Sequence, residues 1–293
     1  MQKKCGYVSI VGKPNVGKST LINKIAEEKV SIVTHKAQTT RQNVRFVKNT
    51  KNSQIIFTDT PGVEASVKST LCKHLNKNSQ ISTFDADLIV FITTVSSWNT
   101  NDEVVLNNIK RAKIPAILVI NKTDRLKNQN EILPIINNLK EKHDFVDILA
   151  ISALKESSMN SFLNVIEKHL PEQEPLFTTD SQTEPDDSFV ISERIRESLL
   201  KNLHQEIPYE STVQVEKIED LDHIKKIHVV IWVNTEGQKR IVIGKGGEVL
   251  KNIGKSSRID LEKYFSRKIH LALWVKIKSS WWENQNFIDK TKI

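Results

Sequence analysis

Two glycine-containing segments of this sequence have residue types and spacings that suit contact with phosphate groups. The first, residues 12–19 (GKPNVGKS), fits the pattern G-x-x-x-x-G-K-[ST] and follows a short apolar stretch at 7–11. In this pattern the backbone N–H groups of the loop converge on phosphate oxygens, the lysine reaches the β- and γ-phosphates, and the hydroxyl binds Mg²⁺. Lys18 and Ser19 occupy the last two positions. The segment therefore predicts a nucleoside triphosphate site with Mg²⁺ as cofactor.

Residues 121–124 (NKTD) predict which base that site accepts. The carboxylate of Asp124 can accept hydrogen bonds from the guanine N1–H and exocyclic amine. Adenine would leave this charge without donors, which costs free energy. We expect Asn121 to hold the loop and bond the base, and the stem of Lys122 to pack over the ring. Ser152 and Ala153 would close the base pocket with backbone contacts, which makes GTP the expected substrate.

Residues 59–62 (DTPG) have the types needed to hold the metal ion and the γ-phosphate. Asp59 can hold Mg²⁺ through water, and the Gly62 N–H can approach the γ-phosphate. In the stretch 38–41 (QTTR), a threonine can place its hydroxyl on Mg²⁺ and its N–H on the γ-phosphate, and we favour Thr40 over Thr39. Because both segments would touch the γ-phosphate, hydrolysis should release them, as in an order-to-disorder switch.

Val63 stands where Ras-like enzymes carry the glutamine that orients the attacking water. We therefore expect slow turnover that depends on Mg²⁺, the loop amides and a K⁺ ion near the Asn15 carboxamide. The predicted catalytic residues are Lys18, Asn15 and Thr40, and the predicted metal ligands are Ser19, Thr40 and Asp59. The predicted GTP contacts are Gly12, Lys13, Pro14, Asn15, Val16, Gly17, Lys18, Ser19, Asp59, Thr60, Pro61, Gly62, Val63, Asn121, Lys122, Thr123, Asp124, Ser152 and Ala153.

The second glycine cluster, residues 244–247 (GKGG), lies between two apolar segments. Such a G-x-x-G turn lets a sugar-phosphate backbone approach closely, as in the KH module, which clamps about four nucleotides of single-stranded RNA or DNA. A tight turn between two helices with no ligand is the alternative. The predicted RNA contacts are Lys239, Arg240, Ile243, Gly244, Lys245, Gly246, Gly247, Lys251 and Ile253. Trp232 and Trp274 alternate within apolar strands and are expected in the core, whereas Trp281 and Trp282 are expected to be partly exposed.

The elements around these segments predict two domains joined by an acidic linker. Short β-branched runs at 7–11, 54–58, 88–93, 116–120 and 148–151 alternate with helix-length segments, which predicts an α/β domain with a mostly parallel sheet. The predicted boundaries are 1–170 for this GTP-binding domain, 171–191 for the linker, 192–280 for a smaller α+β domain of the type II KH class, and 281–293 for a tail.

Composition narrows the class of protein further. The net charge is +8, and only 9 of 293 residues are glycine, so glycine clusters should mark places where the backbone needs them. The longest apolar run has five residues, far short of the roughly 20 that span a bilayer. Two cysteines cannot form a disulfide framework, which fits a reducing cytosol. A secreted or membrane-spanning protein is therefore disfavoured.

Taken along the whole chain, these motifs resemble those of the bacterial Era family of GTPases. The resemblance rests on GKPNVGKS, KAQTTR, DTPG, NKTD, SAL (152–154), EIPYE (206–210), GQKRIVIGKGG (237–247) and LWVKIKSSW (273–281). It implies binding of the 3′ end of small-subunit ribosomal RNA, a role in assembly of the small ribosomal subunit, and use of K⁺ as an activating ion. It also implies a cytosolic monomer with peripheral contact at the inner membrane.

The chain departs from the family pattern at several positions. Val63-Glu64 replaces an Ile-His pair, Ile92-Thr93-Thr94 replaces a Val-Val-Asp strand end, and no glycine follows Leu154. None of these positions is a predicted contact of phosphate, Mg²⁺ or guanine through its side chain. Two other classes of function stay open beside the GTP-dependent RNA switch: a constitutive RNA-binding scaffold and a membrane-associated signalling GTPase.

Overall fold

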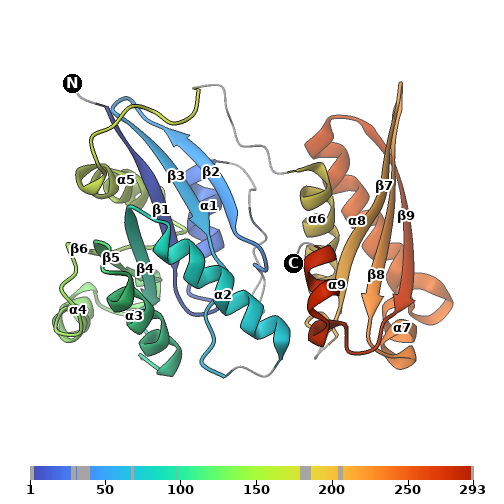
Figure 1. Cartoon of the computed structure of the whole chain (residues 1–293), viewed down its shortest axis with the longest axis horizontal. Coiled ribbons are helices and arrows are strands. Elements are labelled where there is room, and N and C mark those ends of the chain that lie inside the picture. The colour runs from blue at the N-terminus through green and yellow to red at the C-terminus, as the bar shows by residue number, and fades with distance from the viewer. Residues whose placement is uncertain are drawn as a thin grey trace. The chain divides into compact units, whose positions relative to one another are not determined.

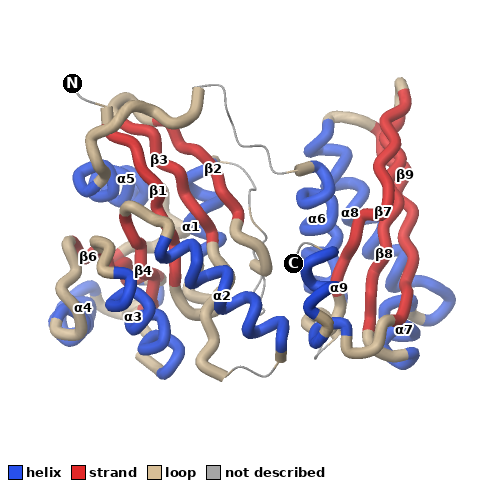
Figure 2. Tube along the Cα trace, in the orientation of Figure 1, coloured by secondary structure: helices blue, strands red, loops and turns tan. Residues whose placement is uncertain are grey.

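The computed structural model describes residues 3–27, 31, 40–66, 69–96, 98–178, 186–203 and 207–291. The chain folds as two compact units: residues 1–68 and 72–184 form the first, and residues 69–71 and 185–293 are grouped in the second. Figure 1 and Figure 2 show a sheet with helices in each unit. The two units are described separately.

The first unit is an α/β fold built on a six-stranded sheet in the order β2-β3-β1-β4-β5-β6. β2 pairs antiparallel with β3 and the other neighbours pair parallel. Its strands are β1 (Lys4–Val11), β2 (Val44–Asn49), β3 (Ser53–Asp59), β4 (Leu88–Thr94), β5 (Ala116–Asn121) and β6 (Asp147–Ala150). Its α-helices are α1 (Lys18–Ala26), α2 (Thr70–Phe84), α3 (Thr100–Ala112), α4 (Ile132–Lys140) and α5 (Ser157–His169).

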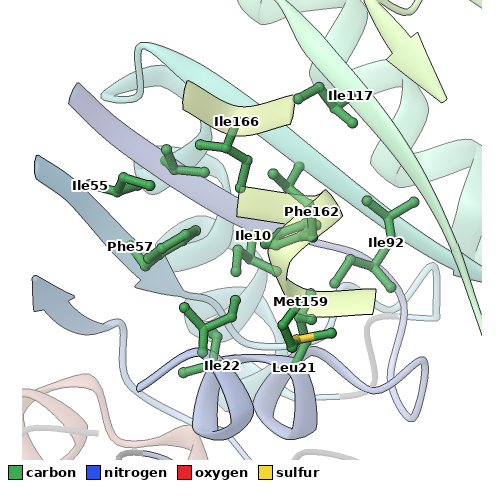
Figure 3. Close-up of a cluster of buried hydrophobic side chains, with 14 of the residues drawn as sticks. Ile10, Leu21, Ile22, Ile55, Phe57, Ile92, Ile117, Met159, Phe162 and Ile166 are labelled. Atoms are coloured by element: carbon green, nitrogen blue, oxygen red, sulfur yellow. The ribbon is translucent and has the colours of Figure 1, made fainter. Parts of the chain in front are cut away.

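Helices cover both faces of this sheet, so the central strands are apolar without alternation. On one face, α1 and α5 pack on β1 and β3 around Leu21, Ile10, Phe57 and Phe162, whose side chains Figure 3 shows gathered in one cluster. On the other face, α3 and α4 pack on β4 and β5. The rings of Phe57 and Phe162 stack at 6.4 Å between centroids. These two cores fix the sheet between layers of helices.

Parallel pairing brings the predicted site residues to a single edge of the sheet. Ile10 at the end of β1 is paired with Asp59, and Thr94 at the end of β4 is paired with Asn121. Loops that follow the carboxyl ends of parallel strands meet at the same edge, which is where α/β folds bind ligands. The segments predicted to hold phosphate, metal and base are therefore neighbours in space.

The second unit has the order α-β-β-α-α-β that is expected for a type II KH domain. It contains α6 (Asp187–Asn202), β7 (Thr212–Leu221), β8 (Ile224–Val233), α7 (Glu236–Ile243), α8 (Glu248–Phe265) and β9 (Lys268–Ile277), followed by α9 (Gln285–Lys290). β8 pairs antiparallel with β7 and parallel with β9. Apolar side chains of α6, α7 and α8 form one core with the strands. Figure 1 shows α6 and α8 on one face of this sheet.

The tryptophan predictions are wrong at two positions. Trp274 is 43% exposed and stacks on His228 at 5.5 Å, because it alternates with the core residues Leu273 and Val275 and so lies on the opposite face of β9. Trp281, expected to be partly exposed, is fully buried and donates its indole N–H to the Glu210 carbonyl at 2.8 Å. The predicted tail therefore packs as part of the second unit.

The predicted linker also differs from the structure at its two ends. Residues 171–178 lie on the first unit: the Gln54 side chain donates to the Phe177 carbonyl and accepts from its N–H, both at 2.9 Å, and Gln173 donates to the Cys5 carbonyl at 2.8 Å. At the other end, α6 begins at Asp187, with Asp186 capping it. Residues 179–185 lie outside the described residues.

Candidate functional site

The phosphate loop between β1 and α1 has a backbone that only particular residues can adopt. Gly17 has φ of 102°, and a Cβ there would lie 2.4 Å from the Asn121 Nδ2 atom. A Cβ on Gly12 would lie 2.3 Å from the Ile92 carbonyl oxygen. Asn15 is also left-handed, with φ of 63°, a conformation that asparagine tolerates better than most residues. The two glycines therefore let the loop fold tightly beneath its neighbouring segments.

Lys18 is held inside this loop. Its side chain is buried and its ammonium donates to the carbonyls of Gly12 and Lys13, each at 3.1 Å. Burial lowers the pKa of Lys18 to about 8, and the negative charge of Asp59 partly opposes that shift. Little negative charge surrounds the Lys18 ammonium, and phosphate oxygens would provide it. The geometry therefore fits the predicted role of Lys18.

The three predicted metal ligands come together at the end of β3. The Ser19 hydroxyl lies 2.9 Å from the Thr40 hydroxyl and donates to Asp59 Oδ2 at 2.9 Å. Asp59 Oδ1 is buried and accepts no hydrogen bond from the described part of the chain. Burial raises the pKa of Asp59, against the effect of the Lys18 charge. A buried carboxylate beside two hydroxyls is a set of hard oxygen donors, which fits Mg²⁺. Thr39, the alternative to Thr40, lies outside the described residues.

The guanine segment is organised by hydrogen bonds from Asn121. Its carboxamide donates to the Val16 carbonyl at 2.8 Å and accepts from the Ala153 N–H at 2.9 Å, so it joins the phosphate loop to the loop after β6. The Lys122 ammonium donates to the Asn15 carbonyl at 2.5 Å, which lays its stem across the site, and burial lowers the pKa of Lys122. Asn121 therefore holds the loop as predicted, whereas its bond to the base and the packing of the Lys122 stem over the ring stay predictions.

Asp124 is prepared to stay ionised. Ser152 donates its hydroxyl to Asp124 Oδ1 at 2.5 Å, and this hydrogen bond is the largest cause of the lowered pKa of Asp124. Only backbone contacts were expected from Ser152, so its side-chain role was missed. Thr123 donates its N–H to the Ile151 carbonyl at 3.2 Å, which supports the turn, and its contact with the nucleotide stays a prediction. An ionised carboxylate at this place suits the two N–H donors of guanine.

The segment after β3 lies against the phosphate loop. A Cβ on Gly62 would lie 2.9 Å from Pro14 Cα, and the Val63 N–H donates to the Gly12 carbonyl at 3.3 Å. The Thr60 hydroxyl donates to the Ile10 carbonyl at 2.7 Å, so its side chain ties β3 to β1. The side chain of Val63 is buried in the core with α3 and cannot orient a water molecule, as expected.

The side chain of Lys13 does not face the phosphate position, so its predicted GTP contact can come only from its backbone. The ammonium of Lys13 lies 2.6 Å from Asp102 Oδ2, on the first turn of α3, so this side chain points away from the phosphate loop and only its backbone can face a phosphate. The motif predicts that the backbone of residue 13 lies in the phosphate loop, but it does not predict where the side chain points. Asp102, Asn76 and Asn101, which hold the loop and the segment after Gly62, were not predicted.

A cavity of about 450 Å³ beside the loop is lined in part by Asn15, Lys122 and Arg125.

The glycine turn of the second unit joins α7 to α8, as predicted. Gly244, Gly246 and Gly247 have φ of 78°, 63° and 80°. A Cβ on Gly244 would lie 2.5 Å from Val249 Cγ2, whereas Gly246 and Gly247 have nothing within 4 Å of the added atom. Gly244 is thus required by packing, and the other two leave an open backbone surface for a ligand.

Around this turn, the predicted RNA contacts divide into surface and core residues. Arg240, Lys245 and Lys251 are exposed, and Lys239 and Ile243 are partly buried. Ile253 is fully buried in the core and cannot contact RNA, which corrects that prediction. Ile241, which was not predicted, is 52% exposed near the turn. No helical spacing links it to the glycine turn, because α7 ends at Ile243, so the sequence held no clear signal for it.

Comparison with known proteins finds a matching family model for each of the two units. Residues 7–122 match the family model described as 50S ribosome-binding GTPase, and residues 206–282 match that of the KH domain. The chain is 40% identical over 284 residues to the GTPase Era of Coxiella burnetii, covering 97% of this chain and 96% of the relative. It is 40% identical over 282 residues to that of Haemophilus influenzae, covering 96% and 93%.

Two solved structures are similar over almost the whole chain. A structure of a single-residue variant of Aquifex aeolicus Era bound to GDP and AlF₄⁻ has a TM-score of 0.94 and 38% identity, covering 98% of each chain. A structure of Era with MgGDPNP and nucleotides 1506–1542 of 16S ribosomal RNA has a TM-score of 0.95 and 38% identity, covering 99% of this chain and 98% of the other. With its guanine-nucleotide site in one unit and its glycine turn in the other, this chain belongs to the Era family of GTPases.

Proposed function

We propose that this GTPase binds the 3′ end of small-subunit ribosomal RNA through its KH domain and acts in assembly of the small ribosomal subunit. The observation that carries the proposal is the open backbone at Gly246 and Gly247, with exposed cations at Arg240, Lys245 and Lys251 around it. Backbone without side chains lets a sugar-phosphate chain approach, and the cations add a salt-dependent attraction. The similar Era structure that contains 16S ribosomal RNA supports this choice of RNA.

We propose Mg²⁺ as the cofactor, held by Ser19, Thr40 and Asp59. The burial of Asp59 Oδ1 and the closeness of the Ser19 and Thr40 hydroxyls to Asp59 Oδ2 support this assignment, as does the Mg²⁺ nucleotide in the similar Era structure. When bound, the ion would neutralise charge on the β- and γ-phosphates. Ser19 and Thr40 would orient their hydroxyl oxygens toward it, and Lys18 would contact the phosphates from inside the loop.

We also propose K⁺ as an activating ion at Asn15. This residue is exposed, lines the cavity beside the phosphate loop and is held in place by the Lys122 ammonium on its carbonyl. Because Val63 cannot orient water, added positive charge near the phosphates would have more effect here than in an enzyme with a glutamine. Turnover measured in KCl and in NaCl, at equal ionic strength, tests this: equal rates would exclude the role of K⁺.

The nucleotide state would control RNA binding, because Thr40 and Gly62 belong to the two segments that reach the γ-phosphate. The test is RNA affinity in the presence of GDP and of a non-hydrolysable GTP analogue. Equal affinities would favour the constitutive scaffold, since a ligand without differential binding shifts no equilibrium.

The RNA site has its own test in Gly246→Asp. The new carboxylate should repel phosphate and weaken binding of an RNA with the 3′-terminal small-subunit sequence by at least about tenfold, while GDP affinity is unchanged. Gly237→Asp is the matched control, because it adds the same charge at the opposite end of α7, where a Cβ meets no atom closer than 3.8 Å. Equal loss in the two variants would mean that net charge, and not the turn, is responsible.

The proposed role places the protein in the cytoplasm as a monomer. Among the described residues, no helix has the length and apolarity needed to cross a bilayer. Peripheral contact with the inner membrane stays a proposal that rests on the resemblance, and it would be tested by sedimentation with anionic vesicles after nuclease treatment. Binding that nuclease abolishes would be binding through RNA.

A further inference from the structure

The ammonium of Lys13 joins the phosphate loop to helix α3. It lies 2.6 Å from Asp102 Oδ2, and the two side chains are only 10% and 0% exposed. Lys18 keeps its own ammonium inside the loop, on the carbonyls of Gly12 and Lys13. The two lysine side chains of the loop therefore point in opposite directions: that of Lys18 toward the phosphate position and that of Lys13 away from it.

Asp102 is itself fixed on all sides. Its Oδ1 accepts the Thr93 hydroxyl at 3.0 Å, from the end of β4, and its Oδ2 accepts the Asn99 N–H at 3.0 Å. Asn99 in turn caps α3 through its own carboxamide, so that the two side chains form a reciprocal capping box. The N-terminal end of a helix also favours a carboxylate. This geometry leaves Asp102 little freedom to move when the loop moves.

The preceding residue of the same helical turn holds the other side of the site. Asn101 Oδ1 accepts the Ala65 N–H at 2.8 Å, three residues after Gly62. Asn76 of α2 accepts the Glu64 N–H at 3.2 Å and donates to the Glu64 carbonyl at 2.8 Å. The segment that must present the Gly62 N–H to the γ-phosphate is thus held by two asparagines.

We propose that the first turn of α3 is a positioning element for GTP hydrolysis. Asp102 sets the phosphate loop through Lys13, and Asn101 sets the segment after Gly62, so that the two groups that face the γ-phosphate keep a fixed separation while GTP is bound. Asp102 and Asn101 are positioning residues, because the Asp102 carboxylate is engaged by Lys13 and Asn101 Oδ1 by the Ala65 N–H. Asn101 also lines the cavity beside the phosphate loop, but its side-chain oxygen is held by that N–H. Their different contacts give them different effects: Asp102 acts on every phosphate-bearing nucleotide, and Asn101 only on the reaction at the γ-phosphate.

Asn101→Ala tests the second of these roles. Single-turnover hydrolysis of GTP should slow about tenfold, since small misplacements of reacting groups are costly, whereas GDP affinity should stay within about twofold of the parent. Asn107→Ala is the matched control, because Asn107 is exposed on the same helix. If Asn101→Ala hydrolyses GTP as fast as Asn107→Ala, the proposed role of Asn101 is wrong.

Asp102→Asn, and the double variant that combines it with Lys13→Met, test the proposed role of Asp102. Asp102→Asn leaves the buried Lys13 charge without the Asp102 carboxylate, so both the melting temperature and GDP affinity should fall, the latter about tenfold. The double variant removes both charges and should recover the melting temperature while GDP affinity stays low, because no tie between loop and helix is restored. Recovery of the affinity together with the melting temperature would overturn the proposal and leave the pair with a purely stabilising role.

Discussion

Binding of GDP at pH 8 should take up about half a proton, because Lys18 must regain its positive charge beside phosphate. In the nucleotide-free protein, burial lowers the pKa of Lys18 from 10.5 to about 8. Two phosphates next to the ammonium would favour the charged form and return the pKa toward its ordinary value. The difference in protons bound then depends on pH in a way that can be calculated.

With a pKa of about 8 in the free protein and about 10.5 in the complex, uptake by Lys18 is about 0.1 proton at pH 7 and about 0.5 at pH 8. At pH 8.5 it is about 0.75 by the same relation. The terminal phosphate of GDP is already ionised at these values, since its pKa lies near 6. GDP affinity should accordingly decrease as pH rises above 8, by up to about tenfold for each pH unit.

The measurement is calorimetry of GDP binding in two buffers of different ionisation enthalpy, at pH 7, 8 and 8.5. Divalent cations are left out, so that no metal ion displaces a proton from Asp59. Lys18→Arg is the matched control, because a guanidinium stays charged throughout this range. The control should show no rise in proton uptake between pH 7 and 8.5. Uptake near zero at pH 8 in the parent protein, or equal uptake in Lys18→Arg, would refute the lowered pKa of Lys18.

The same shift predicts how stability depends on pH in the nucleotide-free protein. Because the folded pKa of Lys18 is lower than the unfolded one, the unfolded chain binds more protons between pH 8 and 10.5. The free energy of unfolding should therefore gain up to about 3 kcal/mol from Lys18 as pH rises through that window. Urea unfolding of the parent and of Lys18→Met at pH 7.5 and 9.5 measures the part of this gain that falls between those values, about 2 kcal/mol, which the variant must lack.

Two further predictions follow from the guanine site and the glycine turn. Asp124→Asn should weaken GDP binding by roughly a hundredfold and improve binding of xanthosine diphosphate, because a carboxamide can donate to the oxygen that replaces the guanine amine; fluorescence titration with both nucleotides checks this, and an unchanged preference for GDP would contradict the assigned role. Gly244→Ala should destabilise the second unit by about 3 kcal/mol or more, because its Cβ would collide with Val249, whereas Gly246→Ala should cost about 1 kcal/mol for its left-handed backbone alone. Denaturant unfolding of both variants measures the difference, and equal losses would show that φ alone decides the cost.

The sequence predicted the parts of the site whose geometry is local. Gly12, Gly17, Lys18 and Ser19 follow one strand and open one helix, so their spacing alone determines which groups meet a phosphate. The roles of Asn121 and Asp124 were equally predictable, because a short turn after a strand determines where both side chains point. The same holds for Gly244, which the structure places in a turn between two helices, as expected.

The sequence did not predict contacts between distant residues. The partner of Lys13 is 89 positions away, on a helix whose first turn looks like any capped helix. Lys13 was therefore assigned to the nucleotide by its place in the motif. The burial of Trp281 has the same origin, since it depends on the tail folding back on Glu210. Trp274 was misplaced because an apolar strand does not reveal which of its faces is covered.

The bonds between Gln54 and Phe177 determine where an isolated GTPase fragment has to end. A fragment cut at residue 170, where the sequence alone places the domain end, would remove both Phe177 backbone partners of the Gln54 amide, which is only 2% exposed and would keep its hydrogen bond to Asn49. Each of the two hydrogen bonds lost is worth about 0.5–1.5 kcal/mol, and together they are a measurable share of the stability of an ordinary domain. The practical domain end for expression is therefore residue 178, and biochemical comparisons made with a shorter fragment would report the damage of the cut along with the properties of the nucleotide site.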